Sequence, residues 1–124
     1  MALTEKAKAD WEKTLKELKL ADENDEVEEQ VMANYYEKLF IFKNQVKGNI
    51  LFTRERFVFC STFGINNVSI PYKDIKEVAL CKVGLMPGFE LTITDSKKNK
   101  DVRYMFALMH RDDWVDFIER KRNS

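Results

Sequence analysis

The chain has 124 residues, of which 44% are hydrophobic and 12% aromatic, enough to fill the core of one domain. Its formal net charge is zero, and with only four Gly and two Pro it is neither collagen-like nor of low complexity. The charge is uneven, however. Residues 1–30 carry five Lys against ten Asp or Glu, whereas residues 31–124 carry sixteen Lys or Arg against eleven Asp or Glu. The positive excess of residues 31–124 permits contact with anionic surfaces without requiring it.

The first predicted element is an amphipathic helix over residues 3–20. Its apolar positions recur at helical spacing on one face, at Leu3, Ala7, Trp11, Leu15 and Leu18. Thr4 is placed to cap the start of this helix. We expect the apolar face to dock on the rest of the chain, and a helix of a partner is the alternative.

Residues 21–30 form an acidic connector, and the segment after it fits two structures. Residues 27–39 place Val27, Val31, Tyr35 and Leu39 at helical spacing. Residues 31–36 also fit a strand, because Val and Tyr favour β structure. The local pattern leaves both structures open.

A β-hairpin is predicted within Gly48 to Phe63, after a polar turn at residues 43–45. Strands over residues 47–53 and 56–63 flank a second polar turn. In the latter strand one face carries Phe57, Phe59, Ser61 and Phe63, and the other carries Val58, Cys60 and Thr62.

Four further strands are predicted over residues 68–72, 77–83, 89–94 and 102–108, with Pro71 placing the first at an edge or end. The glycines and proline of residues 84–88 should break the chain between two of them. A helix then begins at Arg111, with acids in its first turn and basic residues in its last. The fold class is therefore mainly β (α+β): about seven antiparallel strands in a barrel or sandwich, plugged by a C-terminal helix that carries Trp114.

Cys60 and Cys81 lie inside strand-like runs without a Cys-x-x-Cys pair, so we expect buried thiols in a reducing compartment and neither a metal nor a cofactor. The charged N-terminus lacks a signal-like apolar stretch, and Ala2 stands where myristoylation needs Gly. No run approaches the roughly 18–20 apolar residues of a membrane span. These features predict a cytoplasmic protein.

Four segments in order resemble signatures of GRAM and bacterial pleckstrin-homology (PH)-like domains. Residues 47–59 (KGNILFTRERFVF) resemble G-x-L-Y-L-T-x-x-R-L-x-F, and residues 69–78 (SIPYKDIKEV) resemble S-I-P-L-x-D-I-x-x-V. Residues 87–94 (PGFELTIT) and Phe106 with residues 111–115 (RDDWV) match two more. The resemblance covers about residues 30–120 and implies a seven-stranded bent sheet or barrel capped by a C-terminal helix, with residues 33–36 in the first strand. It divides the chain into a helical extension (1–24), the connector (25–30) and a PH-like domain (31–122).

The resemblance implies a non-enzymatic module that binds proteins or lipid headgroups. We expect protein–protein interaction or self-association, with peripheral binding of anionic headgroups through basic loops as the alternative. Phosphoinositide-binding members of the family carry a Lys in the first strand and a basic-x-Arg pair at the start of the second. In this chain Lys38 or Lys43 would supply the first Lys, and Lys47 would be the basic residue of the pair. Asn49 stands where the Arg of that pair would be. The candidate anion residues are Lys43, Lys47, Lys97, Lys98, Lys100 and Arg103.

The candidates for protein interaction are apolar residues of the N-terminal helix or near predicted turns. They are Trp11, Leu15, Leu18, Phe40, Phe42, Leu85 and Met86. Little favours catalysis or nucleic-acid binding: His110 is the single histidine, Cys60 lies among Phe residues, and no basic stripe interleaves with aromatics. Asp112 and Asp113 suit a helix N-terminus rather than a catalytic dyad. The sequence suggests no small-molecule substrate.

Overall fold

The computed structural model describes residues 3–39, 42–95 and 97–124, and the side chains of residues 38, 39, 42 and 43 lie outside that description. Seven strands and two α-helices follow one another in the predicted order. They are α1 (Glu5–Glu17), β1 (Val27–Leu39), β2 (Phe42–Thr53), β3 (Arg56–Ser61), β4 (Val68–Pro71), the 3-10 helix η1 (Tyr72–Asp74), β5 (Ile75–Val83), β6 (Met86–Asp95), β7 (Lys100–Ala107) and α2 (Arg111–Arg122). The predicted mainly β class with a helix at each end is confirmed.

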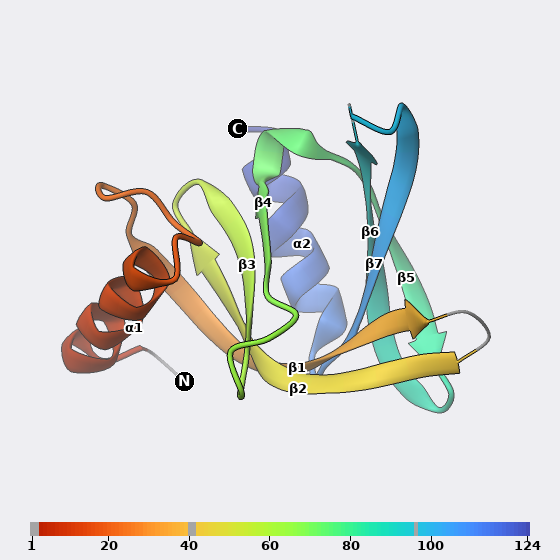
Figure 1. Ribbon diagram of the computed structural model, residues 1–124, viewed down its shortest axis with the longest axis horizontal. Helices are drawn as coiled ribbons and strands as arrows, with labels where there is room; N and C mark the ends of the chain where they lie inside the picture. Colours follow the sequence, from red (N-terminus) through yellow and green to blue (C-terminus); the bar gives the residue numbers. More distant parts are fainter. Residues whose placement is uncertain (1–2, 40–41, 96) are drawn as a thin grey trace.

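The strands form a single antiparallel sheet in the order β4-β3-β2-β1-β7-β6-β5. Strands β1–β4 and β5–β7 are two meanders, joined by the pairs Asn34↔Ala107, Tyr35↔Phe106 and Tyr36↔Met105. The sheet has two edges, β4 and β5, so of the expected alternatives, a bent sheet or a barrel, the chain forms the open sheet. The physical reason is that α2 packs against η1 and β5 and fills the space between the two halves, as Figure 1 shows.

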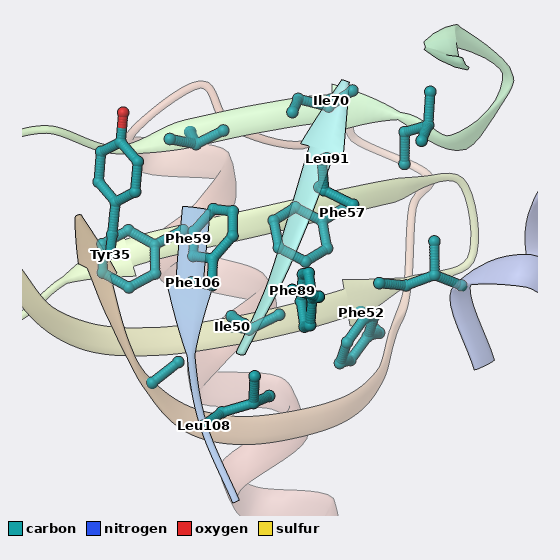
Figure 2. Close-up of a cluster of buried hydrophobic side chains, with 14 of the residues drawn as sticks. Tyr35, Ile50, Phe52, Phe57, Phe59, Ile70, Phe89, Leu91, Phe106 and Leu108 are labelled. Carbon is teal, nitrogen blue, oxygen red and sulfur yellow. The ribbon is translucent and has the colours of Figure 1, made fainter. Parts of the chain in front are cut away.

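The main core lies between the sheet and α2 and is built of aromatic rings. Its largest members are five fully buried phenylalanines, Phe52, Phe57, Phe59, Phe89 and Phe106. They come from four strands, β2, β3, β6 and β7, and gather on one face because side chains alternate along a strand (Figure 2). Burial of each such ring contributes roughly 1.5–3 kcal/mol to folding.

A second, smaller cluster lies on the outer face of β2 and β3, beneath α1. Its buried members are Leu15, Val27, Leu51, Val58 and Cys60. Figure 1 places α1 and α2 on opposite sides of this part of the sheet. The predicted docking of the helix on the chain is therefore confirmed, and it explains why both faces of the central hairpin are apolar.

The start of α1 and its attachment to the sheet each have a polar contact. Thr4 accepts a hydrogen bond from the Ala7 N–H at 3.1 Å, so the predicted cap is confirmed. The Glu12 Oε2 atom accepts one from the Val27 N–H at 2.9 Å, which ties the helix to the first residue of β1. The two α-helices of the described chain, with 13 and 12 residues, are too short to span a membrane.

The segment that the local pattern left open is a strand from Val27 to Leu39, as the resemblance implied, and it begins inside the acidic connector. Two other local expectations change. The predicted turn at residues 43–45 is wrong, because these residues pair with residues 36–38 in a long β1–β2 ribbon. Asn44 and Gln45 stay exposed on this ribbon, so their polar side chains remain solvated while the backbone pairs. The break at residues 84–88 is shorter than expected: Val83 already pairs with Met86 around Gly84, whose φ is 63°.

Candidate functional site

Three exposed methionines line one concavity on the outer face of the sheet. Met32 comes from β1, Met86 from the start of β6 and Met109 from the turn before α2, and their side chains are 78%, 43% and 64% exposed. The concavity has a volume of about 390 Å³. We call it the methionine groove.

The floor of the methionine groove is made by small residues and backbone. Ala33, Gly48 and Ala107 lie there, from β1, β2 and β7. A Cβ on Gly48 would overlap the Cys60 carbonyl oxygen and approach the Phe59 ring to 2.8 Å, so β2 passes too close to β3 for any larger residue. These small residues and the long Met side chains line the same concavity.

The rim of the groove is polar and carries one exposed cation. Lys47 lies on β2 next to Gly48, and Asn34 and Asn49 lie beside it. The Gln30 Nε2 atom donates to the Asn49 Oδ1 atom at 3.0 Å, so Asn49 is held by β1. An apolar floor with a polar rim is typical of a protein interface.

A second concavity lies on the core-facing side of β1, between β4 on one side and β6 and β7 on the other. Tyr35, Glu37, Asn66, Ile93 and Tyr104 contribute to its lining, and its volume is about 430 Å³. Burial, with Glu37 and then Tyr104 adding to it, raises the pKa of Tyr35 to about 12. Burial and then Asp95 raise the pKa of Tyr104. We call this concavity the tyrosine cavity.

The structure separates the predicted anion residues. Asn34 pairs with Lys47 on one side and with Ala107 on the other, and Lys100 precedes Ala107 by seven positions on β7. At about 3.3 Å per residue, this places Lys47 roughly 23 Å from the β6–β7 turn. Lys43 has its backbone in β2, but its side chain lies outside the described residues.

Acidic groups accompany the cations of the β6–β7 hairpin. Lys97 and Lys98 are exposed, and their backbone N–H groups donate to the Asp95 Oδ1 atom at 3.0 and 3.3 Å. The Arg103 Nε atom lies 3.7 Å from the Glu90 Oε1 atom. On the same hairpin a hydrogen bond from Lys76 lowers the pKa of Asp101. The hairpin is therefore of mixed charge rather than strongly positive.

The predicted apolar residues fall into two groups. Trp11 and Leu15 pack in the cluster under α1, and Leu18 is 42% exposed. Leu85 is 98% exposed at the β5–β6 turn, directly before Met86 in the groove.

Phe40 lies outside the described residues, and so does the side chain of Phe42. Met32 and Met109 were missed by the sequence analysis. Met32 was detectable in principle, because a strand with Tyr35 facing inward turns Met32 outward.

The residues weighed for catalysis do not converge within the described chain. His110 is exposed at the start of α2, where it has a φ of 58° and its side chain makes no capping hydrogen bond. Burial raises the pKa of the Cys60 thiol, which favours the unreactive protonated form. Asp112 lies 3.5 Å from Arg111 in the first turn of α2. In the part of the chain that the structure describes, no group of three or more His, Cys, Asp or Glu side chains could hold a metal ion.

Solved structures give the clearest comparison. The C-terminal domain of an unknown protein from Leishmania infantum superposes with a TM-score of 0.68 and 14% identity, over 94% of this chain and 97% of that chain. The Vps36 N-terminal PH domain matches with a TM-score of 0.55 and 17% identity, over 83% and 80%. The fold is PH-like. The DH/PH structure of p115-RhoGEF agrees, with a TM-score of 0.59 and 12% identity over 90% of this chain and 34% of that one.

At these identities the likeness to PH domains shows the fold alone. No family model matches the chain, and no curated protein matches it.

Proposed function

We propose that the chain is a non-enzymatic PH-like binding module that binds another protein through the methionine groove. The observation that carries the proposal is the convergence of Met32, Met86 and Met109 from three separate segments on one exposed concavity. Methionine side chains are flexible and polarisable, and they adapt to varied apolar partners. Leu85 enlarges the apolar border of this surface.

The chemistry of the groove defines its partner. An apolar side chain would enter between the methionines, over the floor at Ala33 and Gly48. A carboxylate next to that side chain would face Lys47 on the rim, which gives the partner its orientation and a faster encounter. We therefore expect an apolar segment with an adjoining Asp or Glu.

Peripheral binding of anionic headgroups has less support. Among the predicted cations, Lys47 and Lys100 lie roughly 23 Å apart along the strand direction, by the strand spacing given above. Asp95 and Asp101 reduce the positive potential of the β6–β7 hairpin. The GRAM-like motifs and the buried free thiol of Cys60 favour an interaction module of the cytoplasm.

The test is a selection of displayed peptides against the intact chain. Enriched peptides should share an apolar residue beside an acidic one, and Met32→Glu should weaken their binding by about tenfold or more because it places a charge in the groove. Leu80→Glu is the matched control, since Leu80 is 54% exposed but lies outside the groove lining.

Three outcomes would contradict the proposal. The first is that no peptide is enriched, or that Met32→Glu and Leu80→Glu behave alike. The second is that light scattering finds a dimer that Met32→Glu dissociates, which would make a second copy of the chain the occupant. The third is that the chain floats with anionic liposomes and that Met32→Glu abolishes this flotation, which would favour the lipid alternative.

A further inference from the structure

The tyrosine cavity has a chemistry that the interaction proposed above does not use. It lies on the opposite face of β1 from Met32 and Asn34 of the methionine groove, because Tyr35 and Glu37 alternate with them along the strand, and the two concavities share no lining residue. Its volume of about 430 Å³ falls within the roughly 300–1,000 Å³ typical of small-molecule sites.

Aromatic rings form one wall of this cavity. The rings of Tyr35 and Tyr104 lie with their centroids 6.1 Å apart and an angle of 38° between their planes. Tyr35 is only 9% exposed and packs its ring against Phe59 and Phe106 at 5.6 and 5.2 Å. Figure 2 shows its hydroxyl directed away from these rings, toward the margin of the cluster. The Tyr104 ring is more exposed, so a ligand can reach it.

The charges beside these rings are negative. Glu37 is two residues after Tyr35 on β1, on the same face, and its carboxylate has no ion pair within the described residues. Asp95 lies at the end of β6 and acts on Tyr104. Both acids disfavour the phenolate forms, which adds to the effect of burial. Lys100 pairs across the strands with Asp95, but its side chain is exposed to solvent.

Neutral polar groups complete the rim. Asn66 projects from the β3–β4 loop with a φ of 60°, and its side-chain amide makes no hydrogen bond within the described chain. Asn67 is already engaged, because its Oδ1 atom accepts from the Ser61 N–H at 2.9 Å. The Asn66 carbonyl oxygen is thus an acceptor that remains available to a ligand.

We propose that the tyrosine cavity binds an organic cation of the guanidinium type, with Glu37 as its counter-ion and Tyr104 as its stacking surface. A guanidinium is flat, so it stacks on a tyrosine ring, and its N–H groups can reach a carboxylate in pairs. The Asn66 carbonyl oxygen accepts a further N–H. A phosphate would be repelled by the Glu37 carboxylate, so the site disfavours anions.

Two sources supply a guanidinium, a free arginine derivative and an arginine side chain of a protein. The test is a titration of the isotope-labelled full chain by NMR with N-acetyl-arginine amide, and in a second arm with a Gly-Arg-Gly peptide. Saturable shifts are expected at the amides of Glu37, Asn66 and Tyr104, with a Kd on the order of millimolar. If the arginine amide and the peptide bind with equal affinity, the guanidinium alone is recognised. If the peptide binds more tightly, the natural ligand is an arginine side chain of a protein. Both results support the site.

Variants and a neutral ligand make the test decisive. Glu37→Gln should weaken binding about fivefold or more, Glu37→Asp should retain most of it, and Tyr104→Leu should weaken it more than Tyr104→Phe. Glu90→Gln is the matched control, because Glu90 loses the same charge on the opposite face of β6 and pairs with Arg103. Equal shifts with N-acetyl-citrulline amide, equal effects of Glu37→Gln and Glu90→Gln, or preferential shifts with inorganic phosphate would overturn the proposal.

Discussion

Tyr35 lies between the aromatic core and an acidic rim, and both surroundings disfavour its ionisation. Its pKa is about 12 in the folded chain against an ordinary value of about 10. Because the folded pKa is the higher one, the contribution of Tyr35 to stability is complete below about pH 10 and is lost as the pH rises toward 12. The pKa values of Tyr72 and Tyr104 shift in the same direction.

Alkaline unfolding follows from these tyrosines. The free energy of unfolding, measured with urea at a series of pH values, should fall steeply above about pH 10. Tyr35→Phe should make this fall shallower, because one group with a raised pKa is gone. Tyr36→Phe serves as the control, since Tyr36 alternates with Tyr35 and faces away from the core. If the free energy of unfolding falls with pH equally steeply in the unmodified chain, Tyr35→Phe and Tyr36→Phe, the tyrosine explanation is wrong.

Single residues also show where the sequence analysis succeeded and where it stopped. Gly48 was recognised as part of a motif, but its physical role depends on the approach of the Cys60 carbonyl, twelve positions away, which no local pattern reveals. The exposure of Met32 depends on which face of β1 is buried. The local pattern left that segment open between helix and strand, and the resemblance assigned a strand without saying which face is buried, so the central residue of the methionine groove was missed.

Helix α1 acts as a cover for the outer face of β2 and β3. Leu15 is fully buried in this contact, so Leu15→Ala should lower the free energy of unfolding by roughly 2–5 kcal/mol. The loosened helix should also increase the rate at which a thiol reagent modifies Cys60, which is 6% exposed beneath it. Leu18→Ala is the control, because Leu18 is already 42% exposed. An unchanged modification rate in Leu15→Ala would mean that the helix does not guard this face.

Elements with strong alternation or helical spacing were predicted well. Their apolar residues follow the spacing of a strand or a helix, as in the central hairpin, β6, β7 and both helices. The β1–β2 ribbon was not predicted in full, because Asn44 is a common turn former and its neighbour Gln45 is polar. Their pairing with Glu37 and Tyr36 depends on the partner strand rather than on their own preferences.

At the scale of the molecule, α2 replaces the strand pairing that would have closed a barrel. Trp114 stacks on Phe52 with 5.0 Å between ring centroids and 9° between planes. Arg122 donates to the carbonyl oxygens of Ile75 and Lys76 at 3.0 and 2.6 Å. The sequence predicted the helix and its inner face, but an open or a closed sheet depends on how far apart the edge strands lie. Likewise, lysines scattered along the chain did not reveal that Lys47 and the β6–β7 hairpin are far apart.

The narrow contact between β1 and β7 has a kinetic consequence. All other strand pairs of the described chain join neighbours in sequence, whereas Tyr35 and Phe106 are 71 positions apart. Each meander can therefore form from local contacts, and joining the two requires one long loop closure. The Phe106 ring takes part on both sides of this step, since it contacts Tyr35, Phe57 and Phe59 in one half and Phe89 in the other.

Phe106→Leu should accordingly slow folding in stopped-flow refolding experiments, because it weakens the Tyr35–Phe106 contact that offsets the entropy cost of loop closure. Ile70→Val, a smaller change within the first meander, should also act mainly on the folding rate, because that meander is already formed when the two halves join. An effect of Ile70→Val confined to the unfolding rate would show that the first meander does not form before the halves join. In this chain the slowest event of folding is expected to be the meeting of two preformed sheets around a single phenylalanine.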